Sequence, residues 1–577
     1  MDMPRRITIG EQSFLTLRER NYFYVDKTKF IRDWWLGGDP VTLITRPRRF
    51  GKTLMLDAVK TFFAPECAGR SDLFEGLEVW NDEQIRLLQG KIPVIFLSFA
   101  RFTNNTYSSI ISRIKTALVS TYGSFSTYID MQAIPDPEKE IFMSVNSSMT
   151  DETAQDSLHY LCKFIAVQYG IKPIILLDEY DTPLQQAWLH GFWDEMTNFM
   201  RGFFNATFKD NPWIGRGLIT GITRVAKESI FSDMNNLNVV GITSELYSDC
   251  FGFTEEEVFL AMDEYGLKEK NKVKEWYDGF IFGKQKEIYN PWSIVNYLSE
   301  KKFSTYWANT SSNAFVGELI ANGDEIVKEE TERLLHGKSI ITKLDEQIIF
   351  HELYTKEGAI WSLLMAAGYV KPLCFNYETE MYEIVLTNLE SKKILEKRIS
   401  EWFGEARISK NNFVKALLYN NLEEMNDWIN DITKKVFSFF DTTPSGSKEE
   451  RPENFYHAFI LGLIVDLKQY EIRSNSESGY GRYDVMLIPK NRLDHGIVIE
   501  FKTYRPKKEA DLTVTCNNAL KQIYEKEYIV QLKSKGVSVN NIYVYGFAFK
   551  GKYVQILGGK YTEIDWERIL NNNASLS

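Results

Sequence analysis

The stretch TRPRRFGKTL, residues 45–54, follows the pattern of a phosphate-binding loop, except that Arg46 stands where the first glycine is usual. Gly51 would let the backbone approach a phosphate closely, and Lys52 can reach the β- and γ-phosphates of a nucleotide. The Thr53 hydroxyl suits a Mg²⁺ ion at the N-terminus of a helix. Because Gly-Lys-Thr also opens ordinary helices, this motif needs a second element before it indicates a nucleotide site.

KPIILLDEYDTP, residues 172–183, supplies that element, because it is an apolar strand that ends in Asp178 and Glu179. Adjacent acids at the carboxyl end of a buried strand are costly unless they hold a metal ion or activate water. We expect Asp178 to hold Mg²⁺ through water and Glu179 to polarise the water that attacks the γ-phosphate. The alternative is a solvated loop start with two ordinary acids, but the two motifs together favour a nucleotide site.

A second group of reactive side chains lies near the C-terminus. YDVMLIP and GIVIEFK predict two strands joined by the polar KNRLD turn, and pairing Pro489 with His495 places Asp484 opposite Glu500. Strand alternation puts Glu500 and Lys502 on the same face of the sheet. Two carboxylates and a lysine would therefore converge at one end of a hairpin.

This group is what a metal-dependent phosphodiesterase needs. Asp484 and Glu500, with the backbone carbonyl of Phe501, would hold Mg²⁺ or Mn²⁺, since oxygen-only ligands favour these ions over zinc. Lys502 would orient or deprotonate the attacking water. The alternative is a cross-strand ion pair in which Asp484 and Glu500 bracket Lys502.

Apolar strands that alternate with helical segments would position the nucleotide motifs. VTLIT (41–45), KIPVIFLSFA (91–100) and the start of RGLITGITRVAKESIF (216–231) are typical of buried strands, which predicts a doubly wound α/β layer. The last of these strands leads to Thr223 and Arg224. Thr223 could contact the γ-phosphate or water, and Arg224 could stabilise charge in the transition state or pair with a nearby acid.

The motifs NYFYVDKTKFI, RPRRFGKTL, LLDEYDTP, TGITRVAKESIF, FGFTEEEV, WYDGF and YNPWSI, in that order, resemble the bacterial AAA-ATPase-like family with a C-terminal PD-(D/E)xK nuclease-superfamily domain. That family's loop is the arginine-rich RPRRFGKS/T, which accounts for the missing glycine. The resemblance implies that the nucleotide contacts Arg46, Pro47, Arg48, Arg49, Phe50, Gly51, Lys52, Thr53 and Leu54, with the arginines adding positive charge around the phosphates. It also implies that a first nuclease helix contributes Glu453 and a later one contributes Gln522.

The expected architecture is a multidomain α/β protein. Residues 1–250 would form an AAA-like (ASCE) P-loop domain around a parallel sheet, and residues 441–577 a nuclease-like α/β domain that follows a Pro-, Gly- and Ser-containing linker. Residues 251–440 would form a helical middle domain, whose first helix begins with a capping box of Thr254 and Glu257. This domain would also contain a small winged-helix-like hairpin around NYETEMYEI. In the N-terminal FYVDKT segment we expect Asp26 and Lys27 to form a structural ion pair.

The net charge of −10 means that any DNA contact must come from a local basic face, such as TYRPKK at 503–508, which is otherwise an ordinary solvated turn. The five cysteines form no CxxC pair, so the sequence argues against a zinc ribbon or a disulfide framework. Without a signal-peptide pattern or an apolar run of bilayer length, we expect a soluble cytoplasmic protein with no membrane partner.

The sequence therefore predicts an ATP-driven or ATP-gated, metal-dependent DNA nuclease, with ATP and Mg²⁺ at the first site and Mg²⁺ or Mn²⁺ at the second. A binding switch with a nuclease fold that recognises nucleic acid or protein without cutting is the alternative. A small-molecule kinase is disfavoured by Asp178-Glu179 and the nuclease-like domain. A homo-oligomer stays open, because Arg224 or a neighbouring subunit could supply an arginine finger.

Overall fold

The computed structural model divides into two compact units, Met1–Thr310 with Gly337–Lys393, and Ser311–His336 with Ile394–Ser577. We call these the N-terminal unit and the C-terminal unit and describe each by itself. The predicted domain boundaries at 250 and 440 stay a prediction. The structure describes residues 4–571 except for 127–128, 210, 226–229, 232–233, 308–318, 321–324, 336, 349–352, 354–355, 357, 403–406, 438–459, 462, 465–466, 468, 479–480, 507 and 551–552.

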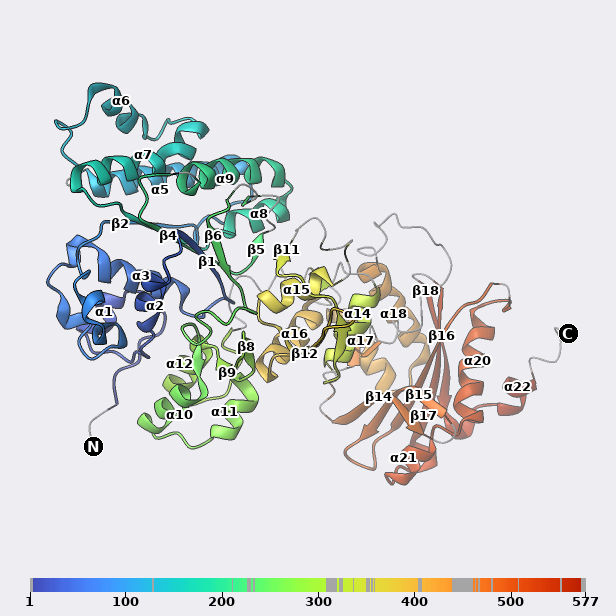
Figure 1. The fold of residues 1–577 in the computed structure, drawn as a ribbon. Coiled ribbons are helices and arrows are strands. Elements are labelled where there is room, and N and C mark those ends of the chain that lie inside the picture. Colours follow the sequence, from blue (N-terminus) through green and yellow to red (C-terminus); the bar gives the residue numbers. More distant parts are fainter. Residues whose placement is uncertain are drawn as a thin grey trace. The chain divides into compact units, whose positions relative to one another are not determined.

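A five-stranded parallel sheet forms the centre of the N-terminal unit (Figure 1). Its strands, in spatial order, are β2 (Val94–Ser98), β3 (Ile174–Asp178), β4 (Arg216–Gly221), β1 (Val41–Thr45) and β6 (Leu237–Val240). Strand β4 thus lies between the strand that precedes the phosphate loop and the strand that ends in the acids, as an ASCE-type sheet requires. β1 and β3 are buried along their whole length, which fits strands covered on both faces. The predicted strands and the parallel α/β layer are confirmed.

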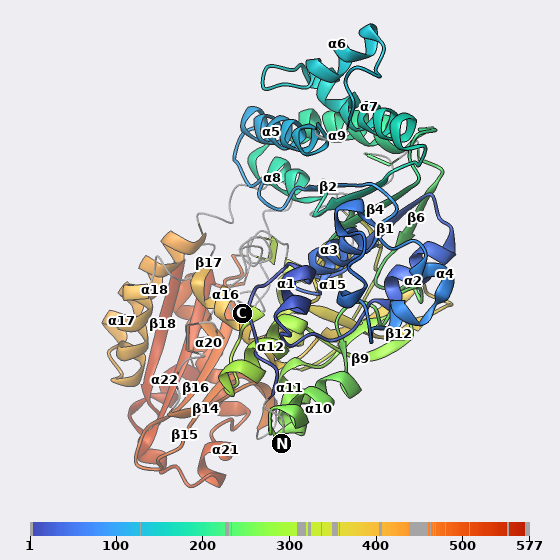
Figure 2. The ribbon, with the colours of Figure 1, turned by 90° about the vertical axis from the view of Figure 1, so that its left-hand side faces the viewer.

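Helices cover both faces of this sheet, as Figures 1 and 2 show from two directions. One face carries α5 (Tyr107–Phe125), α7 (Asp151–Tyr169), α8 (Thr182–His190) and α9 (Trp193–Phe208), and the other carries α1 (Phe14–Glu19), α2 (Lys29–Gly37) and α3 (Lys52–Phe63). The short helices α4 (Glu83–Arg86) and α6 (Asp136–Ser144) complete this region. Helix α3 starts at Lys52, and α8 starts just after the acidic motif. The phosphate loop and the acidic motif therefore each lie between the end of a strand and the start of a helix.

A helical module follows the parallel sheet and packs around its own core. It contains β7 (Phe253–Thr254), α10 (Glu255–Glu264), α11 (Lys270–Tyr277), β8 (Phe280–Phe282), β9 (Gln285–Tyr289) and α12 (Pro291–Glu300). The expected capping box is present, because the Thr254 side chain accepts from the Glu257 amide and the Glu257 carboxylate accepts from the Thr254 amide. We call residues 251–300 the aromatic module, after the Phe, Tyr and Trp side chains that it presents to its neighbours.

The rest of the N-terminal unit contains a three-stranded antiparallel sheet with the order β10-β13-β12. The hairpin predicted around NYETEMYEI is confirmed. The elements are β5 (Arg224–Val225), which pairs with β11 (Gln347–Ile348), then β10 (Ile340–Thr342), α15 (Ala359–Ala366), β12 (Val370–Asn376) and β13 (Met381–Leu386). Helix α16 (Leu389–Trp402) spans the point at which the two units divide.

The C-terminal unit is built on a mixed five-stranded sheet. Its order is β14 (Tyr470–Ser478), β15 (Gly481–Pro489), β16 (Gly496–Thr503), β17 (Ile542–Lys550) and β18 (Tyr553–Lys560). Helices α17 (Arg407–Leu418) and α18 (Leu422–Phe437) pack on one face, and α20 (Leu512–Glu525), α21 (Val530–Ser534) and α22 (Trp566–Asn571) pack on the other. Helix α14 (Glu325–Leu335) also belongs to this unit.

Candidate functional site

The phosphate-loop backbone has the shape that the sequence predicted. Gly51 has a φ of 80° and is the N-cap of α3. This left-handed conformation favours glycine. A Cβ at Gly51 would meet nothing within 4 Å, so the space above the loop is open and the backbone conformation alone requires the glycine. Leu54, by contrast, turns into the core of the unit, where it packs half-buried against the apolar cluster.

Lys52 is buried at the base of this loop, with 4% of its surface exposed. Its Nζ donates to the carbonyl oxygens of Arg46, at 2.9 Å, and of Pro47, at 3.0 Å. Burial lowers the pKa of Lys52, and the charges of Glu179 and Asp178 oppose that shift. The ammonium group is therefore held by carbonyl oxygens of its own loop, and the charges of the two acids act on it.

Asp178 is the meeting point of three strand ends. Its Oδ2 accepts from Thr53 Oγ1 at 2.9 Å and from Ser98 Oγ at 3.2 Å, and its Oδ1 accepts from Thr220 Oγ1 at 2.8 Å. Burial, and then the charge of Glu179, raises the pKa of Asp178. The predicted neighbours Thr53 and Asp178 are therefore in contact. Ser98 and Thr220 were not predicted, although each is a hydroxyl residue near the carboxyl end of a strand that flanks β3.

Glu179 has an unusual backbone. Its φ is 50°, in the left-handed region that a non-glycine residue adopts at a cost of about 1 kcal/mol. The side chain is partly exposed, and Thr182 Oγ1 lies 3.5 Å from its Oε2. Strained backbone of this kind collects at functional positions, because the surrounding structure must hold it there.

The other side chains of the loop point in different directions. Arg46 is fully buried, and its Nη1 donates to the carbonyls of Thr45, Val240 and Gly241 at 2.9, 3.2 and 2.7 Å. Its guanidinium also lies 4.6 Å from the centre of the Phe282 ring. The side chain of Arg46 therefore belongs to the protein interior, which corrects the expectation that it adds charge beside the phosphates. Buried strand-end carbonyls need a donor, and Arg46 supplies it.

Arg49 and Phe50 attach the loop to the aromatic module. The Arg49 guanidinium lies 4.2 Å from the centre of the Trp292 ring. The Phe50 ring is buried and packs against Phe280 and Phe282, with centroids 4.8 and 5.4 Å away. The Phe50 side chain is thus a packing group, and a contact between the Phe50 backbone and the nucleotide stays a prediction. Arg49 and Phe50, which are unusual residues for a phosphate-binding loop, therefore have their partners in the aromatic module.

Thr223 lies at the end of β4 but its hydroxyl is engaged elsewhere. Thr223 Oγ1 and the backbone amides of Thr223 and Ile222 all donate to Asp181 Oδ2 at 3.0 Å. Thr223 is 1% exposed, so the hydroxyl is not presented to solvent. Arg224 is partly exposed and pairs through its backbone with Gln347 of β11. Asp181 was overlooked in the sequence, although it is the third acid of LLDEYD.

The N-terminal segment provides a further correction. Lys27 Nζ pairs with Glu257 Oε2 at 2.7 Å and does not pair with Asp26. Asp26 instead accepts from the Thr28 amide at 2.8 Å and from the Glu78 amide at 2.7 Å. Both side chains are structural, as expected, but each stabilises a different element, because adjacent side chains on an extended chain point apart.

The C-terminal hairpin has the register that the sequence predicted. Val485, Met486 and Leu487 of β15 lie opposite Ile499, Val498 and Ile497 of β16. Asp484 Oδ2 accepts a hydrogen bond from the Phe501 amide at 2.7 Å. The Asp484 carboxylate on β15 therefore contacts the backbone of β16 next to Glu500. The Phe501 ring is buried beside Phe547, with centroids 5.6 Å apart. The role of the Phe501 carbonyl as a ligand stays a prediction.

Glu500 is 2% exposed and lies at the centre of this group. Its Oε1 accepts from Gln522 Nε2 and lies 3.5 Å from Lys502 Nζ. Burial, followed by the charge of Asp484, raises the pKa of Glu500 to about 9, and Lys502 opposes that shift. The Glu500 Oε2 atom is buried without a hydrogen-bond partner among the residues that the structure describes. A buried carboxylate oxygen in that position is a ready cation ligand, so these residues fit a divalent metal ion.

Gln522 was expected from the resemblance, and helix α20 does bring it to the acids. Its Nε2 donates both to Glu500 and to Tyr528 Oη, the latter at 3.0 Å. Tyr528 is 1% exposed and was not predicted. Glu453, the acid expected from the first nuclease helix, lies outside the described residues, as does the predicted linker at 441–453.

Comparisons with known proteins agree with the two halves of this geometry. Residues 8–231 match a family described as predicted AAA-ATPase, and residues 451–558 match the PD-(D/E)XK nuclease superfamily. The chain carries an AAA-ATPase-like domain and a PD-(D/E)XK nuclease-superfamily domain. The loop and the acids of β3 belong to the first, and Asp484, Glu500, Lys502 and Gln522 to the second.

Two further proteins are similar. The chain is 23% identical over 554 residues to an uncharacterised protein in the vnfD 5′ region of Azotobacter chroococcum mcd 1, covering 93% of this chain and 95% of that protein. It is 11% identical to the tetratricopeptide-repeat STAND protein PH0952 from Pyrococcus horikoshii, with a TM-score of 0.24 over 72% of this chain. The chain spans 52% of the length of that protein.

One other acidic cluster lies outside the two sites described above. Glu255, Asp278 and Glu287 place carboxylate oxygens within 4.8 Å of one another. Lys274 pairs with Glu255, at 2.6 Å, and with Glu287, so one ammonium group already offsets part of their charge. Among the described helices, none combines the length and apolar character needed to cross a bilayer.

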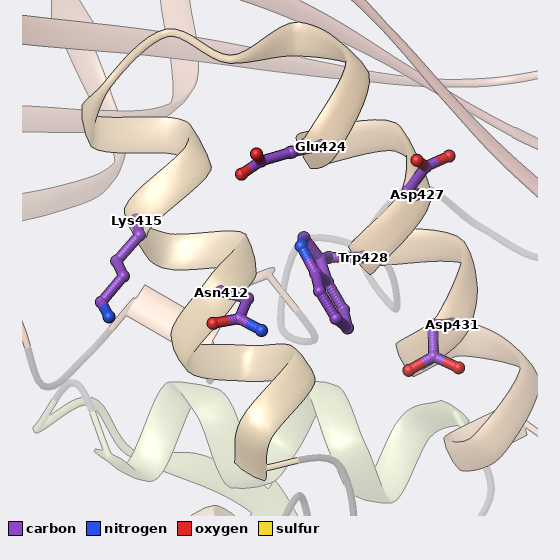
Figure 3. A pocket seen from close by; sticks show the side chains of 6 residues that line it. All are labelled: Asn412, Lys415, Glu424, Asp427, Trp428 and Asp431. Atoms are coloured by element: carbon purple, nitrogen blue, oxygen red, sulfur yellow. The ribbon is translucent and has the colours of Figure 1, made fainter.

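A cavity of about 610 Å³ opens between α17 and α18 of the C-terminal unit (Figure 3). The Trp428 ring projects between the two helices in this view. None of the residues predicted for nucleotide binding or cleavage lines it. The lining residues are Asn412, Lys415, Glu424, Asp427, Trp428 and Asp431.

Proposed function

We propose that this protein binds and hydrolyses ATP in its AAA-ATPase-like domain and cleaves DNA phosphodiester bonds in its nuclease-superfamily domain. The observation that carries the nuclease half is the buried Glu500 carboxylate, which Asp484, Lys502 and Gln522 surround and which keeps one oxygen without a partner among the described residues. An isolated buried carboxylate is costly, so a site that retains one is suited to a cation.

In the nuclease domain, Asp484 and Glu500 would hold a Mg²⁺ or Mn²⁺ ion, which would stabilise the charge that develops on the phosphate. Lys502, whose Nζ lies 3.5 Å from Glu500, would orient the attacking water or take its proton. Gln522 would fix the Glu500 carboxylate through its amide. Each of these residues comes from the β15–β16 hairpin or from α20, so rigid elements hold the group.

In the ATPase domain, Lys52 would exchange the Arg46 and Pro47 carbonyls for phosphate oxygens. Thr53 and Asp178, now hydrogen-bonded to each other, would share the Mg²⁺ ion that accompanies ATP. Glu179 would polarise the attacking water. We propose ATP and Mg²⁺ as the ligands of this site on the strength of that arrangement.

The nuclease half is tested with the full-length chain, linear, circular and single-stranded DNA, and Mg²⁺ or Mn²⁺, with and without ATP. Asp484→Asn and Lys502→Ala should each lower cleavage by about 100-fold or more, since each removes a group that acts on the reacting phosphate. Asp494→Asn, an exposed aspartate in the turn between β15 and β16, is the matched control and should cleave like wild type.

If wild type leaves every form of DNA intact under all of these conditions but still binds DNA, the non-cleaving switch is the better description.

The ATPase half is tested by measuring phosphate release from ATP. Lys52→Ala should abolish this release, whereas Lys60→Ala, which changes an exposed lysine on the same helix, should not. Phosphate transferred to an acceptor in place of free phosphate would indicate a kinase.

A further inference from the structure

A basic turn follows directly on β16, the strand that carries Glu500 and Lys502. We use this name for the described residues Tyr504, Arg505, Pro506 and Lys508. The Arg505 and Lys508 side chains are exposed, and neither makes a hydrogen bond or an ion pair with another residue that the structure describes. Two cations are therefore available to a ligand at the end of the strand that carries the proposed catalytic group.

The basic turn is tied to the neighbouring strand β17. The Tyr504 amide donates to the carbonyl oxygen of Phe549, near the end of that strand, at 2.9 Å. Lys550, the last residue of β17, is a third exposed cation, and its Nζ lies 4.8 Å from the centre of the Tyr504 ring. The sheet therefore fixes the start of the turn and brings a further positive charge to it.

Glu509 connects the same turn with helix α20. Its Oε2 accepts from the Arg505 amide and from Thr515 Oγ1, each at 2.8 Å, and its Oε1 accepts from Asn518 Nδ2 at 3.0 Å. Thr515 is buried in the C-terminal unit, so the helix side of this connection is held by the core. Both oxygens of the Glu509 carboxylate are thus used to keep the turn against α20.

The same face of α20 also holds the proposed catalytic group. Asn518, which donates to Glu509, lies four residues before Gln522 on this helix. Gln522 donates to Glu500. Side chains at that spacing share one face of a helix and lie about 6 Å apart along its axis. The carboxylate that fixes the basic turn and the carboxylate proposed to hold the metal ion are therefore bound by adjacent turns of one helix.

We propose that Arg505 and Lys508 bind backbone phosphates of the DNA strand beside the phosphate that is cut, and that Glu509 is a positioning residue that holds their turn in place. This inference rests on the proposed nuclease function and names its contact with the substrate. The chain has a net charge of −10, so a fixed local group of cations is needed to bring a phosphodiester to the metal site. Contacts with phosphates carry no base recognition, so the effect should not depend on the DNA sequence.

The contact is tested with the full-length chain and a labelled DNA duplex. The double variant Arg505→Ala/Lys508→Ala should raise the KM for cleavage in Mg²⁺ about tenfold and change kcat by less than about twofold, because it leaves the metal site intact. Fluorescence anisotropy with Ca²⁺ in place of Mg²⁺ measures binding alone. The slope of log Kd against log salt concentration should fall by about 2, one for each lost phosphate contact.

Lys490→Ala/Arg492→Ala is the matched control. It also removes two exposed cations, but from the turn that precedes β16, which the length of this strand places roughly 26 Å from the basic turn. The net charge changes equally in the two double variants, so any effect of overall charge is the same in both. KM and the salt slope of the control should stay at the wild-type values.

Glu509→Ala separates positioning from simple charge. It removes a negative charge beside the proposed DNA contact, so electrostatics alone would tighten DNA binding. If Glu509 holds the cations in place, KM should instead rise about threefold and the salt slope should fall. Glu509→Gln also removes the charge but keeps an accepting oxygen, so it should raise KM by less. If Glu509→Ala does not fold, as judged by its melting curve, Glu509→Gln carries the same test.

An unchanged KM and salt slope in Arg505→Ala/Lys508→Ala, an equal loss in the control pair, or tighter DNA binding by the Glu509 variants would each overturn the inference. A wild type that cuts DNA no better than Arg505→Ala/Lys508→Ala contradicts only the role of the basic turn. A wild type that binds DNA through these two cations but never cuts it contradicts the proposed cleavage and supports the contact. A wild type that neither binds nor cuts DNA contradicts both.

Discussion

The nucleotide loop and the C-terminal hairpin both gather acids and a lysine, but over very different lengths of chain. Thr53 and Asp178, which are hydrogen-bonded, are 125 positions apart, whereas Asp484 and the Phe501 amide are 17 positions apart. The first pair depends on the parallel sheet, and the second on the register of one hairpin. Spacing in the sequence therefore predicts the second group directly and the first only through a fold.

Asp178 and Glu500 also differ in how many hydrogen-bond partners the protein gives their carboxylate oxygens. Asp178 accepts from three hydroxyl groups, while Glu500 keeps a buried oxygen that lacks a partner among the described residues. Asp178 is thus held in place by its own neighbours, whereas Glu500 requires a proton or a cation to offset its burial. We infer that protein groups already order the proposed nucleotide site, whereas the proposed nuclease site needs a cation to complete it.

The largest effects are expected when each site is disabled in turn and both activities are measured. Asp484→Asn should lower DNA cleavage by about 100-fold or more and leave ATP hydrolysis unchanged, because the two sites use separate groups. Lys52→Ala should abolish ATP hydrolysis and, if nucleotide gates cleavage, lower cleavage as well. Loss of ATP hydrolysis in Asp484→Asn would contradict the independence of the two sites.

Arg46 and Arg49 should contribute differently to the free energy of unfolding. Arg46→Ala should lower the free energy of unfolding by about 3 kcal/mol, because it leaves buried carbonyls without their charged donor. Arg49→Ala should lower it by less than about 1 kcal/mol, since it removes one exposed contact with Trp292. Chemical denaturation of both variants checks the difference, and equal losses would show that Arg46 is not the interior group described above.

The pH dependence of metal binding sharpens the contrast further. Because burial raises the pKa of Glu500 to about 9, this carboxyl group is protonated at neutral pH without a cation, and a divalent ion must displace that proton. Metal affinity should therefore rise by up to about tenfold per pH unit between pH 6 and 8. Calorimetry with Mn²⁺ in buffers of different ionisation enthalpy should detect the released proton, and Glu500→Gln should remove both effects.

The raised pKa of Glu500 also makes the stability of the metal-free protein depend on pH. The native state holds the Glu500 proton more tightly than the unfolded chain, so without metal the stability contributed by this group falls as pH rises from about 4.5 to about 9. Glu500→Gln should then be more stable than wild type at pH 8 and show less advantage at pH 5. Thermal melting in chelator measures this, and a gap that is constant with pH would contradict the raised pKa.

Features that depend on residues close together in the chain could be predicted from residue type and spacing alone. Strand and helix patterns placed Gly51 and Lys52 at the start of a helix and Asp178 at the end of a buried strand. The register of the predicted hairpin placed Asp484 close to Glu500. The capping box of α10 was also visible, because its two side chains are three residues apart. Local geometry limits such pairs so strongly that residue type and spacing suffice.

The long-range partner of each polar side chain, by contrast, is set by the folded arrangement of the elements. It turned Arg46 onto strand-end carbonyls, gave Lys27 to Glu257, and made Asp181 the support of Gln185 and Thr223. Several arginines and acids near one site offer many pairings of similar energy, and packing selects among them by burying some and exposing others. That selection depends on the positions of whole elements, which residue spacing does not encode.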